Sequence, residues 1–310
     1  MDESGLNFNP PIGAAQELEP GLKRILAPNP SPMTFRGTNT YMLGTNDIAI
    51  IDPGPEDDQH LTNILRALKT TQKITHILVT HSHIDHSPLA KRLSELTGAK
   101  IYARGPTGIG QSAIMRDLLA SGYVGGGEGS DDNFSPDICL NDGDIIDIAG
   151  LSVEVIFTPG HFGNHVSFAW NDALVSGDHV MDWATSMVSP PDGDLADFMA
   201  SCRKLEERDW RIFYPGHGAP VQDPKARLNW LLNHRLQRET QILDQLRIAP
   251  KTPKGLAEAI YTDTDSSLLG AAARNVFAHL IDLCSRGKVE TDGPPRFEKT
   301  YALGAGNGHN

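Results

Sequence analysis

Apolar and polar positions alternate between strand-like and helix-like spacing from the start of the chain to about Pro224. Short apolar runs bounded by Gly, Pro or Asp predict strands, whereas apolar residues three and four positions apart predict helices. Strands are expected at 22–27, 38–44, 48–52, 74–80, 100–103, 145–148, 151–157, 165–170, 173–176 and 211–214. Helices are expected at 61–69, 87–97 and 195–207. The order strand, helix, strand over 74–103 predicts a βαβ unit.

After Pro224 the spacing becomes mainly helical. Thr252 and Ser266 are the expected N-caps of two of the helices in this part. Helices are expected at 226–246, 253–261 and 266–287, followed by two β-like segments at 288–291 and 296–303. Helices followed by a hairpin predict a winged-helix-like module, which is a fold and not a function.

These patterns divide the chain into three parts. We expect a loosely ordered lead-in over residues 1–20, a main α/β domain over 21–224 and an accessory domain over 225–310. Residues 122–130 contain five glycines in nine positions, which predicts a flexible loop, either a lid or a surface excursion.

The composition is that of a globular protein with an acidic surface. Apolar residues make up 39% of the chain, charged residues 21%, and the formal net charge is −12. Such a charge repels polyanions overall. The acidic excess lies in residues 1–224, because residues 225–310 hold 12 Lys and Arg against 9 Asp and Glu.

Other features favour a cytoplasmic protein with no membrane partner. No apolar run reaches the roughly 20 residues of a membrane-spanning helix, and residues 1–5 lack the basic flank and apolar core of a secretory signal. The cysteines Cys139, Cys202 and Cys284 are odd in number and far apart, so we expect reduced, buried thiols.

The densest group of metal-competent side chains directly follows a predicted strand. Residues 80–86 read Thr-His-Ser-His-Ile-Asp-His, in a chain with 12 histidines. Alternate residues of an extended segment point the same way, so His81, His83 and Asp85 converge on one side. His86 follows where the chain turns into a helix and reaches the same space from another angle. Imidazole and carboxylate ligands suit zinc, iron or manganese.

Three more side chains of this kind lie just past the ends of later strands. His161, Asp178 and His217 each follow an apolar strand through a turn that contains glycine. Open α/β sheets place their sites at the carboxyl ends of strands. Any one of these residues fits an ordinary turn, but four strand ends with metal-competent groups indicate a shared site. Seven ligands are too many for one tetrahedral ion and suit two ions.

The order of these motifs resembles the metallo-β-lactamase superfamily. The chain has Thr-His-x-His-x-Asp-His, then Pro-Gly-His, Gly-Asp and Pro-Gly-His-Gly, within about residues 33–220. The resemblance implies a four-layer αββα sandwich with two divalent metal ions, zinc in the first place and iron or manganese as alternatives. It implies one ion held by His81, His83 and His161, the other by Asp85, His86 and His217, and Asp178 as the bridge.

A narrower resemblance comes from residues 176–183 and 190–194 together with the terminal module. These runs, Ser-Gly-Asp-His-Val-Met-Asp-Trp and Pro-Pro-Asp-Gly-Asp, are similar to the β-lactamase-like protein 2 group, whose animal member is an endoribonuclease acting on single-stranded RNA. Asp178 with His86 is also similar to glyoxalase II, but the glutathione-binding region of that family has no match here. Secreted antibiotic-degrading branches have Cys or Ser where this chain has Asp178, so antibiotic hydrolysis is not the expected role.

Roles within the site are assigned as hypotheses. Asp178, as the bridge, and Asp85, which would orient the nucleophile, are the expected catalytic residues. Asp52 ends a buried strand at the same sheet edge and either supports a ligand imidazole or caps a turn. His165 lines the substrate pocket or begins a strand, and His179 supports the site or is structural.

The expected activity is hydrolysis of an ester, thioester or lactone, in which a hydroxide held between the metals attacks the carbonyl carbon. The first alternative is a metal-dependent endoribonuclease, which the accessory module favours and the net charge opposes. An iron-dependent redox enzyme ranks last, because oxygen-reducing relatives usually have glutamate at the position of His83. The expected partner is a small-molecule substrate or single-stranded RNA, and a homodimer is the default assembly.

Overall fold

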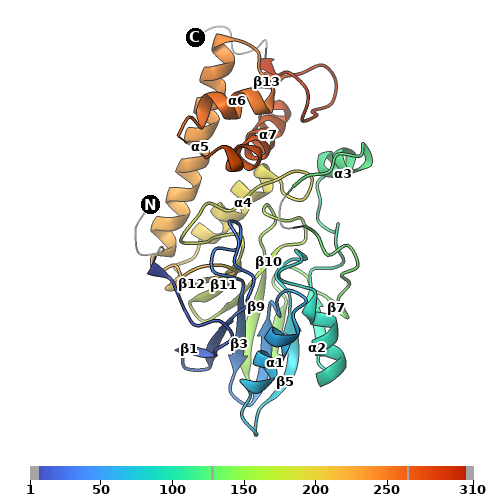
Figure 1. Cartoon of the computed structure of the whole chain (residues 1–310), viewed down its shortest axis with the longest axis vertical. Coiled ribbons are helices and arrows are strands. Elements are labelled where there is room, and N and C mark those ends of the chain that lie inside the picture. The colour runs from blue at the N-terminus through green and yellow to red at the C-terminus, as the bar shows by residue number, and fades with distance from the viewer. Residues whose placement is uncertain (1–6, 127–128, 264, 305–310) are drawn as a thin grey trace.

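The structure is a computed structural model that describes residues 7–126, 129–263 and 265–304. Its larger part is a sandwich of two sheets with helices on the outer sides, and its smaller part is a helical module near the C-terminus (Figure 1).

The first sheet is built from the N-terminal half of the chain, and its strands lie in chain order. Neighbouring strands are antiparallel from the first to the fourth and parallel from the fourth to the seventh. The strands are β1 (Gln16–Glu19), β2 (Leu22–Leu26), β3 (Asn39–Gly44), β4 (Asp47–Ile51), β5 (Lys73–Leu78), β6 (Lys100–Ala103) and β7 (Ile138–Cys139).

The second sheet follows in the chain and has the order β12-β11-β10-β9-β8. Only the β11–β12 pair is parallel, and helix α4 (Leu195–Glu206) lies between these two strands in the sequence. The strands are β8 (Ile145–Ile148), β9 (Leu151–Phe157), β10 (Val166–Trp170), β11 (Ala173–Gly177) and β12 (Ile212–Pro215).

Strand β4 is apolar from Ile48 to Ile51 because both of its faces are covered there. Ala49 and Ile51 face the core between the two sheets, whereas Ile48 and Ile50 face the helices outside. Successive side chains of a strand point to opposite faces, so a strand that is covered on both faces needs apolar residues at every position.

The helices cover the two outer faces of the sandwich. α1 (Asp58–Arg66) and α2 (Leu89–Thr97) pack on the first sheet, and α4 packs on the second together with the first turns of α5 (Pro224–Ile248). The layers are therefore helix, sheet, sheet, helix, which confirms the predicted αββα class.

The C-terminal module is built around the second half of α5, which leaves the sandwich and continues into the module (Figure 1). Its apolar core also takes in Met115 and Leu118 from α3 (Ala113–Ala120), a helix that the sequence pattern did not predict. The other elements are α6 (Pro253–Ile260), the 3-10 turn η2 (Ser266–Leu268), α7 (Leu269–Ser285), β13 (Val289–Glu290) and β14 (Ala302–Leu303).

Some local expectations differ from the structure. The expected lead-in contains strand β1 from residue 16 onward, and Phe8 is buried; residues 1–6 lie outside the described part. Ser87 does not cap α2, because its hydroxyl donates to Asp131 Oδ2 at 2.8 Å. Ser266 lies in the 3-10 turn η2, and α7 begins after Leu268 without a side-chain cap.

Within the described residues, no helix combines the length and the apolar composition that a membrane crossing requires.

The three cysteines are free, but they differ in exposure. Cys139 on the edge strand β7 is exposed, contrary to the expectation of a buried thiol, whereas Cys202 is buried and Cys284 half-buried. Burial raises the pKa of the Cys202 thiol to about 12 and that of Cys284 to about 11.

We predict that a thiol reagent labels the native protein at Cys139 first. Because the thiolate is the reactive form, Cys202 and Cys284 should react at least about 100-fold more slowly at pH 7.5. Time-resolved labelling with a chromogenic disulfide checks this, and Cys139→Ser is the control that should remove the fast phase. A fast phase that persists in Cys139→Ser would contradict the placement of the other two thiols.

Candidate metal centre

The two sheets meet at one edge of the sandwich, where the ends of several strands are tied together. The Val166 backbone N–H donates to the carbonyl of Thr80 at 2.8 Å, and the Asn39 N–H donates to the carbonyl of Gly216 at 2.7 Å. These bonds join the segment after β5 to β10, and the start of β3 to the turn after β12. Side chains that follow strands of both sheets therefore point into one space.

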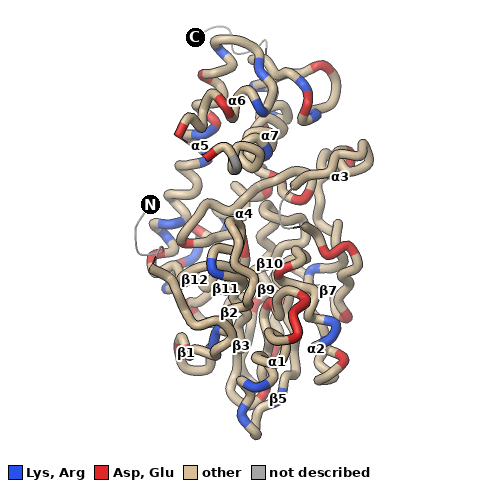
Figure 2. Tube along the Cα trace, viewed as in Figure 1, with Lys and Arg blue, Asp and Glu red and all other residues tan. Residues whose placement is uncertain are grey.

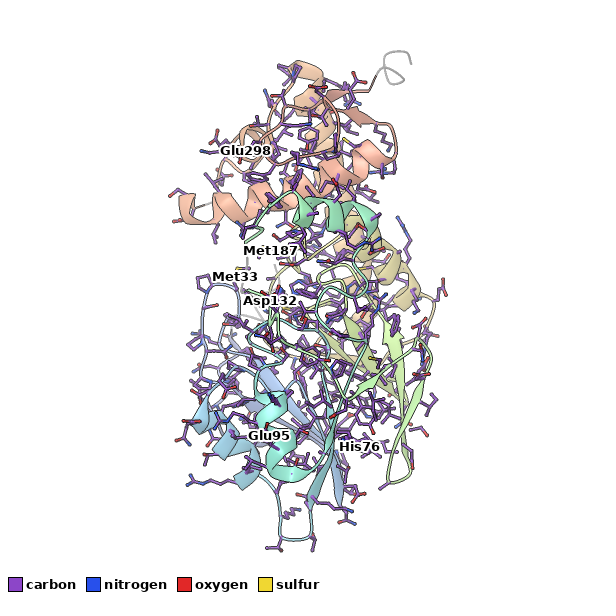
Figure 3. The ribbon with its side chains drawn as sticks, turned by 90° about the vertical axis from the view of Figure 1, so that its right-hand side faces the viewer. Met33, His76, Glu95, Asp132, Met187 and Glu298 are labelled. Atoms are coloured by element: carbon purple, nitrogen blue, oxygen red, sulfur yellow. The ribbon has the colours of Figure 1, made fainter. Side chains whose placement is uncertain are left out.

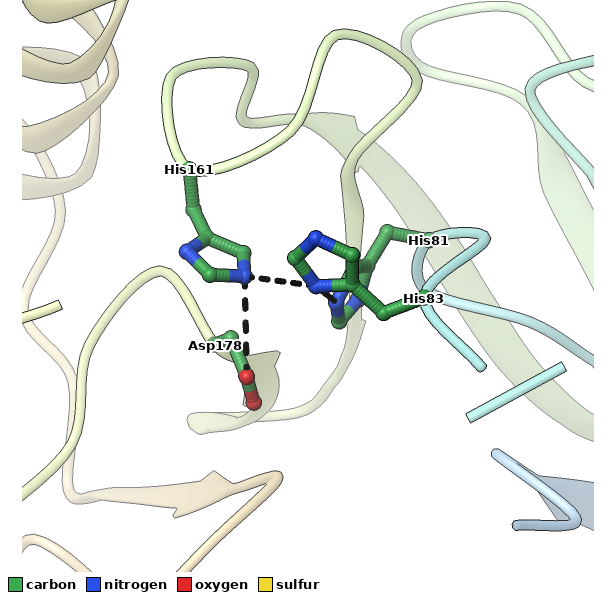
Figure 4. A group of neighbouring side chains, drawn as sticks. All are labelled: His81, His83, His161 and Asp178. Carbon is green, nitrogen blue, oxygen red and sulfur yellow. Dashed lines mark hydrogen bonds and ion pairs between the residues drawn. The ribbon is translucent and has the colours of Figure 1, made fainter. Parts of the chain in front are cut away.

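The first group of side chains consists of His81, His83, His161 and Asp178, all buried (Figure 4). His83 Nδ1 lies 2.9 Å from His81 Nε2 and 3.0 Å from His161 Nε2. His161 Nε2 lies 3.6 Å from Asp178 Oδ2. Nitrogen ligands of a tetrahedral zinc ion lie about 3.3 Å apart, so these separations are close to those of a ligand set.

The second group consists of Asp85, His86 and His217, also buried. Asp85 Oδ2 lies 3.1 Å from His86 Nε2 and 3.2 Å from His217 Nε2. Within each of the two groups, the candidate ligand atoms all lie within 4.8 Å of one another.

Asp178 lies between the two groups. Its Oδ2 is 3.6 Å from His161 Nε2 on one side and 3.2 Å from His217 Nε2 on the other, and its Oδ1 is 3.5 Å from His86 Nε2. A carboxylate in this place can contribute one oxygen to each of two cations. The structure therefore brings together all seven residues that the sequence predicted as ligands.

The ring nitrogens that face away from this space have oxygen neighbours. His161 Nδ1 donates to the Met187 carbonyl at 2.7 Å, and His217 Nδ1 donates to the Gly37 carbonyl at 3.2 Å. His86 Nδ1 lies 2.9 Å from Asp52 Oδ2. A carbonyl only accepts, so each of the two carbonyl bonds keeps a proton on Nδ1 and leaves Nε2 free to bind a metal.

Asp52 acts on two neighbours of the site. Its Oδ1 accepts the Thr80 N–H at 2.7 Å, and its Oδ2 accepts the Thr80 hydroxyl at 2.8 Å in addition to His86. Asp52 itself has φ +50°, a conformation in which Asp is tolerated better than most residues. It thus orients His86 and fixes the turn that leads to His81.

The two remaining histidine candidates lie behind the ligand set. His165 is fully buried against the ring of His81, with ring centroids 5.1 Å apart, and its Nδ1 contacts the Thr158 hydroxyl at 2.9 Å. His179 is directed toward α4, where its Nε2 lies 3.4 Å from Cys202 Sγ.

Several contacts of the ligands were not anticipated from the sequence, including the bond of His217 to the Gly37 carbonyl. The Thr38 hydroxyl donates to Asp85 Oδ2 at 2.8 Å, and the Met187 carbonyl accepts from His161. Thr38 lies in a predicted strand with nothing to distinguish it, and a backbone carbonyl has no sequence signature.

The electrostatics of the two groups differ. Burial lowers the pKa of His81, His83 and His161, that of His83 to about 3, so these rings are neutral and suited to bind a metal. Burial opposes the charge of Asp85 and Asp178 too, but His86 and His217 hold the pKa of both carboxyls well below its usual range. In return, and against the effect of burial, the carboxylates raise the pKa of His86 and His217. The part of the centre formed by the second group and Asp178 therefore attracts positive charge.

The polar atoms left without partners fit metal ions. Among the described residues, four buried atoms directed into this space have no hydrogen-bond partner, namely Asp85 Oδ1, His86 Nε2, Asp178 Oδ1 and His217 Nε2. Leaving such atoms unpaired is costly, and a cation satisfies all of them. The donor set of five imidazoles and two carboxylates suits zinc, iron or manganese.

A small cavity of about 20 Å³ adjoins the first group, large enough for about one water or one substrate atom. Asp192, a residue that the sequence did not single out as a candidate, lies at this cavity. Burial and the neighbouring Asp132 raise the pKa of Asp192 to about 6. The cavity is lined by Met33, His83, Gly126, His161, Met187, Ser189 and Asp192.

Family models match both parts of the chain. A model described as the metallo-beta-lactamase superfamily matches residues 33–217. The chain belongs to this superfamily. A second model, described as a beta-lactamase associated winged helix domain, matches residues 252–296. This match agrees with the winged-helix-like module that the sequence pattern predicted.

Relatives with names cover nearly the whole chain. The Drosophila melanogaster protein named beta-lactamase-like protein 2 homolog is 32% identical over 90% of this chain and 92% of its own length. An atrochrysone carboxyl ACP thioesterase of Aspergillus fumigatus is 27% identical over 88% of this chain and 80% of its own. The predicted resemblance to the superfamily and to the β-lactamase-like protein 2 group is confirmed.

Solved structures agree on the fold. A metallo-beta-lactamase family protein from Thermus thermophilus has a TM-score of 0.73 at 25% identity, over 93% of this chain and all of that one. A beta-lactamase domain protein from Burkholderia ambifaria has a TM-score of 0.77 at 21% identity, over 96% of this chain and 95% of that one.

We predict that Gly216→Ala weakens metal binding by about 10-fold or more. A Cβ at position 216 would lie 2.2 Å from Asp178 Oδ1, which must then move away from the other ligands. Metal content by mass spectrometry and a competition titration with a chelator measure the effect. Gly255→Ala is the matched control, because a Cβ there meets nothing closer than 3.4 Å. Unchanged affinity in Gly216→Ala would argue against Asp178 as a ligand.

Proposed function

We propose that this protein is a hydrolase that holds two divalent metal ions and breaks the bond between the acyl carbon and the leaving oxygen or sulfur of an ester, with a thioester as the favoured substrate class. The observation that carries the proposal is the convergence of seven buried donors in two groups that share Asp178. In the assignment that we favour, one ion would be held by His81, His83 and His161 and the other by Asp85, His86 and His217, and Asp178 would contribute to both.

Two such ions, when bound, would supply Lewis acidity that brings the pKa of a water near 7 and polarises the carbonyl oxygen. The chain's own residues hold this arrangement in place. Asp85 would orient the attacking water, with Thr38 fixing the position of its carboxylate. The Met187, Gly37 and Asp52 oxygens hold the imidazoles of His161, His217 and His86 in the orientation in which they would bind the ions.

The preference for a small, partly apolar substrate rests on the groove that opens at Asp85. This groove has a volume of about 590 Å³ and takes much of its lining from Pro, Met, Ile, Leu and Ala side chains. Such a lining suits an acyl chain better than a sugar-phosphate backbone. The relatives named as ACP thioesterases act on thioesters, and this chemistry fits the same groove.

Cleavage of single-stranded RNA is the second candidate, because the terminal module matches a winged-helix family model. The charge pattern opposes it. The chain carries a net charge of −12, and its Lys and Arg residues are interspersed with acidic ones along the trace drawn in Figure 2. An electrostatic track for a phosphodiester backbone needs clustered cations.

The test measures the metal content of the protein and its activity on a panel of substrates. Purified protein is analysed for Zn, Fe and Mn, then assayed on a medium-chain acyl thioester, an oxygen ester, a lactone and a single-stranded RNA. We expect about two metal ions per chain and the highest kcat/KM on the thioester. Cleavage of RNA alone would replace the proposal with the second candidate, and iron with oxygen consumption would replace it with a redox function.

We predict that Asp178→Asn lowers kcat by at least about 1,000-fold and removes at least one metal ion per chain, since it replaces one of the two carboxylate oxygens by an NH2 group that does not bind a metal. Asp209→Asn, an exposed carboxylate, is the control and should keep both. Full activity with two metal ions in Asp178→Asn would exclude the bridging role.

A further inference from the structure

We propose that Arg274, which the C-terminal module contributes to the groove above the metal centre, binds an anionic group of the substrate. The substrate class would then be an ester or thioester whose scissile carbonyl is separated by an apolar segment from a carboxylate or phosphate. This inference rests on the proposed hydrolase function, and the experiment below separates the two.

The groove is formed jointly by the sandwich and the module. One wall comes from residues 29–34 and from Pro55, Ile84 and Asp85, and the other from residues 268–274 around the start of α7. Met33 lies at the boundary between the two parts of the molecule (Figure 3). Ile84 and Leu268 expose 45% and 44% of their surface, which is high for large apolar side chains. An acyl chain in the groove would cover both.

The charged residues of the groove are few and of opposite sign. Among the described residues that line it, only Asp85 and Arg274 carry a formal charge. Asp85 belongs to the metal centre, and Arg274 belongs to α7. A ligand with its reacting carbonyl at Asp85 and its chain along the apolar lining therefore passes a single cation.

Arg274 has no carboxylate partner among the described residues, unlike Arg286 and Arg296 of the same module. Arg286 pairs with Glu239 at 2.6 Å, and Arg296 pairs with Asp117 at 2.9 Å. No ion pair joins Arg274 to a described residue, and its Nε is buried without a hydrogen-bond partner. A guanidinium left in this state gains more from an anionic ligand than one that is already paired.

The position of Arg274 is set by the glycine-rich segment before residue 127. A Cβ built on Gly126 would lie 2.9 Å from the guanidinium carbon, so the group packs directly on that backbone. Gly126 is in turn fixed by the Ser189 hydroxyl, which donates to its carbonyl at 3.0 Å. Burial lowers the pKa of Arg274, but an arginine stays charged at neutral pH. The groove thus holds a positioned cation that no described carboxylate neutralises.

The experiment measures binding without turnover. Metal-depleted protein is titrated by calorimetry with linear alkyl carboxylates of increasing length, with alkyl phosphates, and with the matched uncharged amides. We expect the best carboxylate or phosphate to bind at least about 10-fold more tightly than its amide, and the preferred anion identifies the group. Arg274→Gln should remove this preference, and Arg274→Lys should keep part of it. Arg247→Gln, an exposed arginine of the same module, should leave it unchanged.

Two results would overturn the inference. One is an anion preference that survives in Arg274→Gln, and the other is tight binding of single-stranded RNA that depends on Arg274 while alkyl anions do not bind. In the metal-loaded protein, Arg274→Gln should raise KM for an anionic thioester about 10-fold and leave kcat within about 3-fold. Arg274-dependent anion binding without hydrolysis of any ester would refute the proposed hydrolase function but would still support the anion site at Arg274.

Discussion

The hydrogen bonds that join the two sheets at their common edge determine whether the candidate ligands meet. Thr80 and Gly216 each accept a backbone N–H from a strand of the opposite sheet, and Gly216 donates its own N–H to the Gly177 carbonyl at 2.9 Å. Asp178 and His217 follow these glycines directly. A shift of one residue at this edge would turn alternate side chains out of the centre. The register in which the two sheets are joined therefore determines the geometry of the centre.

Burying so many polar side chains opposes folding unless their atoms are satisfied. The structure satisfies the outward-facing atoms with the carbonyls of Gly37 and Met187 and with Asp52. Four inward-facing atoms of the described residues, on Asp85, His86, Asp178 and His217, have no hydrogen-bond partner. A cation that binds only the folded chain would therefore add its binding free energy to the stability of the sandwich. The same carboxylates that would bind metals raise the pKa of His86 and His217, so metal ions and protons compete for this space.

Most of the sandwich and all seven candidate ligands could be predicted from the sequence, because the signals are local. A buried strand that ends in a glycine turn followed by His or Asp can be recognised from a few consecutive residues of the sequence. The contacts that could not be predicted are long-range. Thr38 reaches Asp85 across 47 positions, and α3 packs on a module more than 100 residues away. The N-cap predicted at Ser87 was wrong for a similar reason, because its hydroxyl donates to the distant residue Asp131.

The C-terminal module affects the centre through the segment that holds His161. Buried Arg235 of α5 donates to the Ser186 carbonyl, and Asn275 of α7 accepts the Val188 N–H at 3.2 Å. Between these two points lies Met187, whose carbonyl orients His161. The C-terminal module thus holds residues 186–188 on both sides of the Met187 carbonyl. The module would then serve the active site twice, by fixing one ligand from behind and by forming the outer wall of the groove in front. Variation at the α7 residues that line the groove, Ala271 and Arg274 among them, would change the substrate, whereas Asn275 of the same helix is tied to the ligand His161. This division suits a superfamily in which one fold supports many reactions.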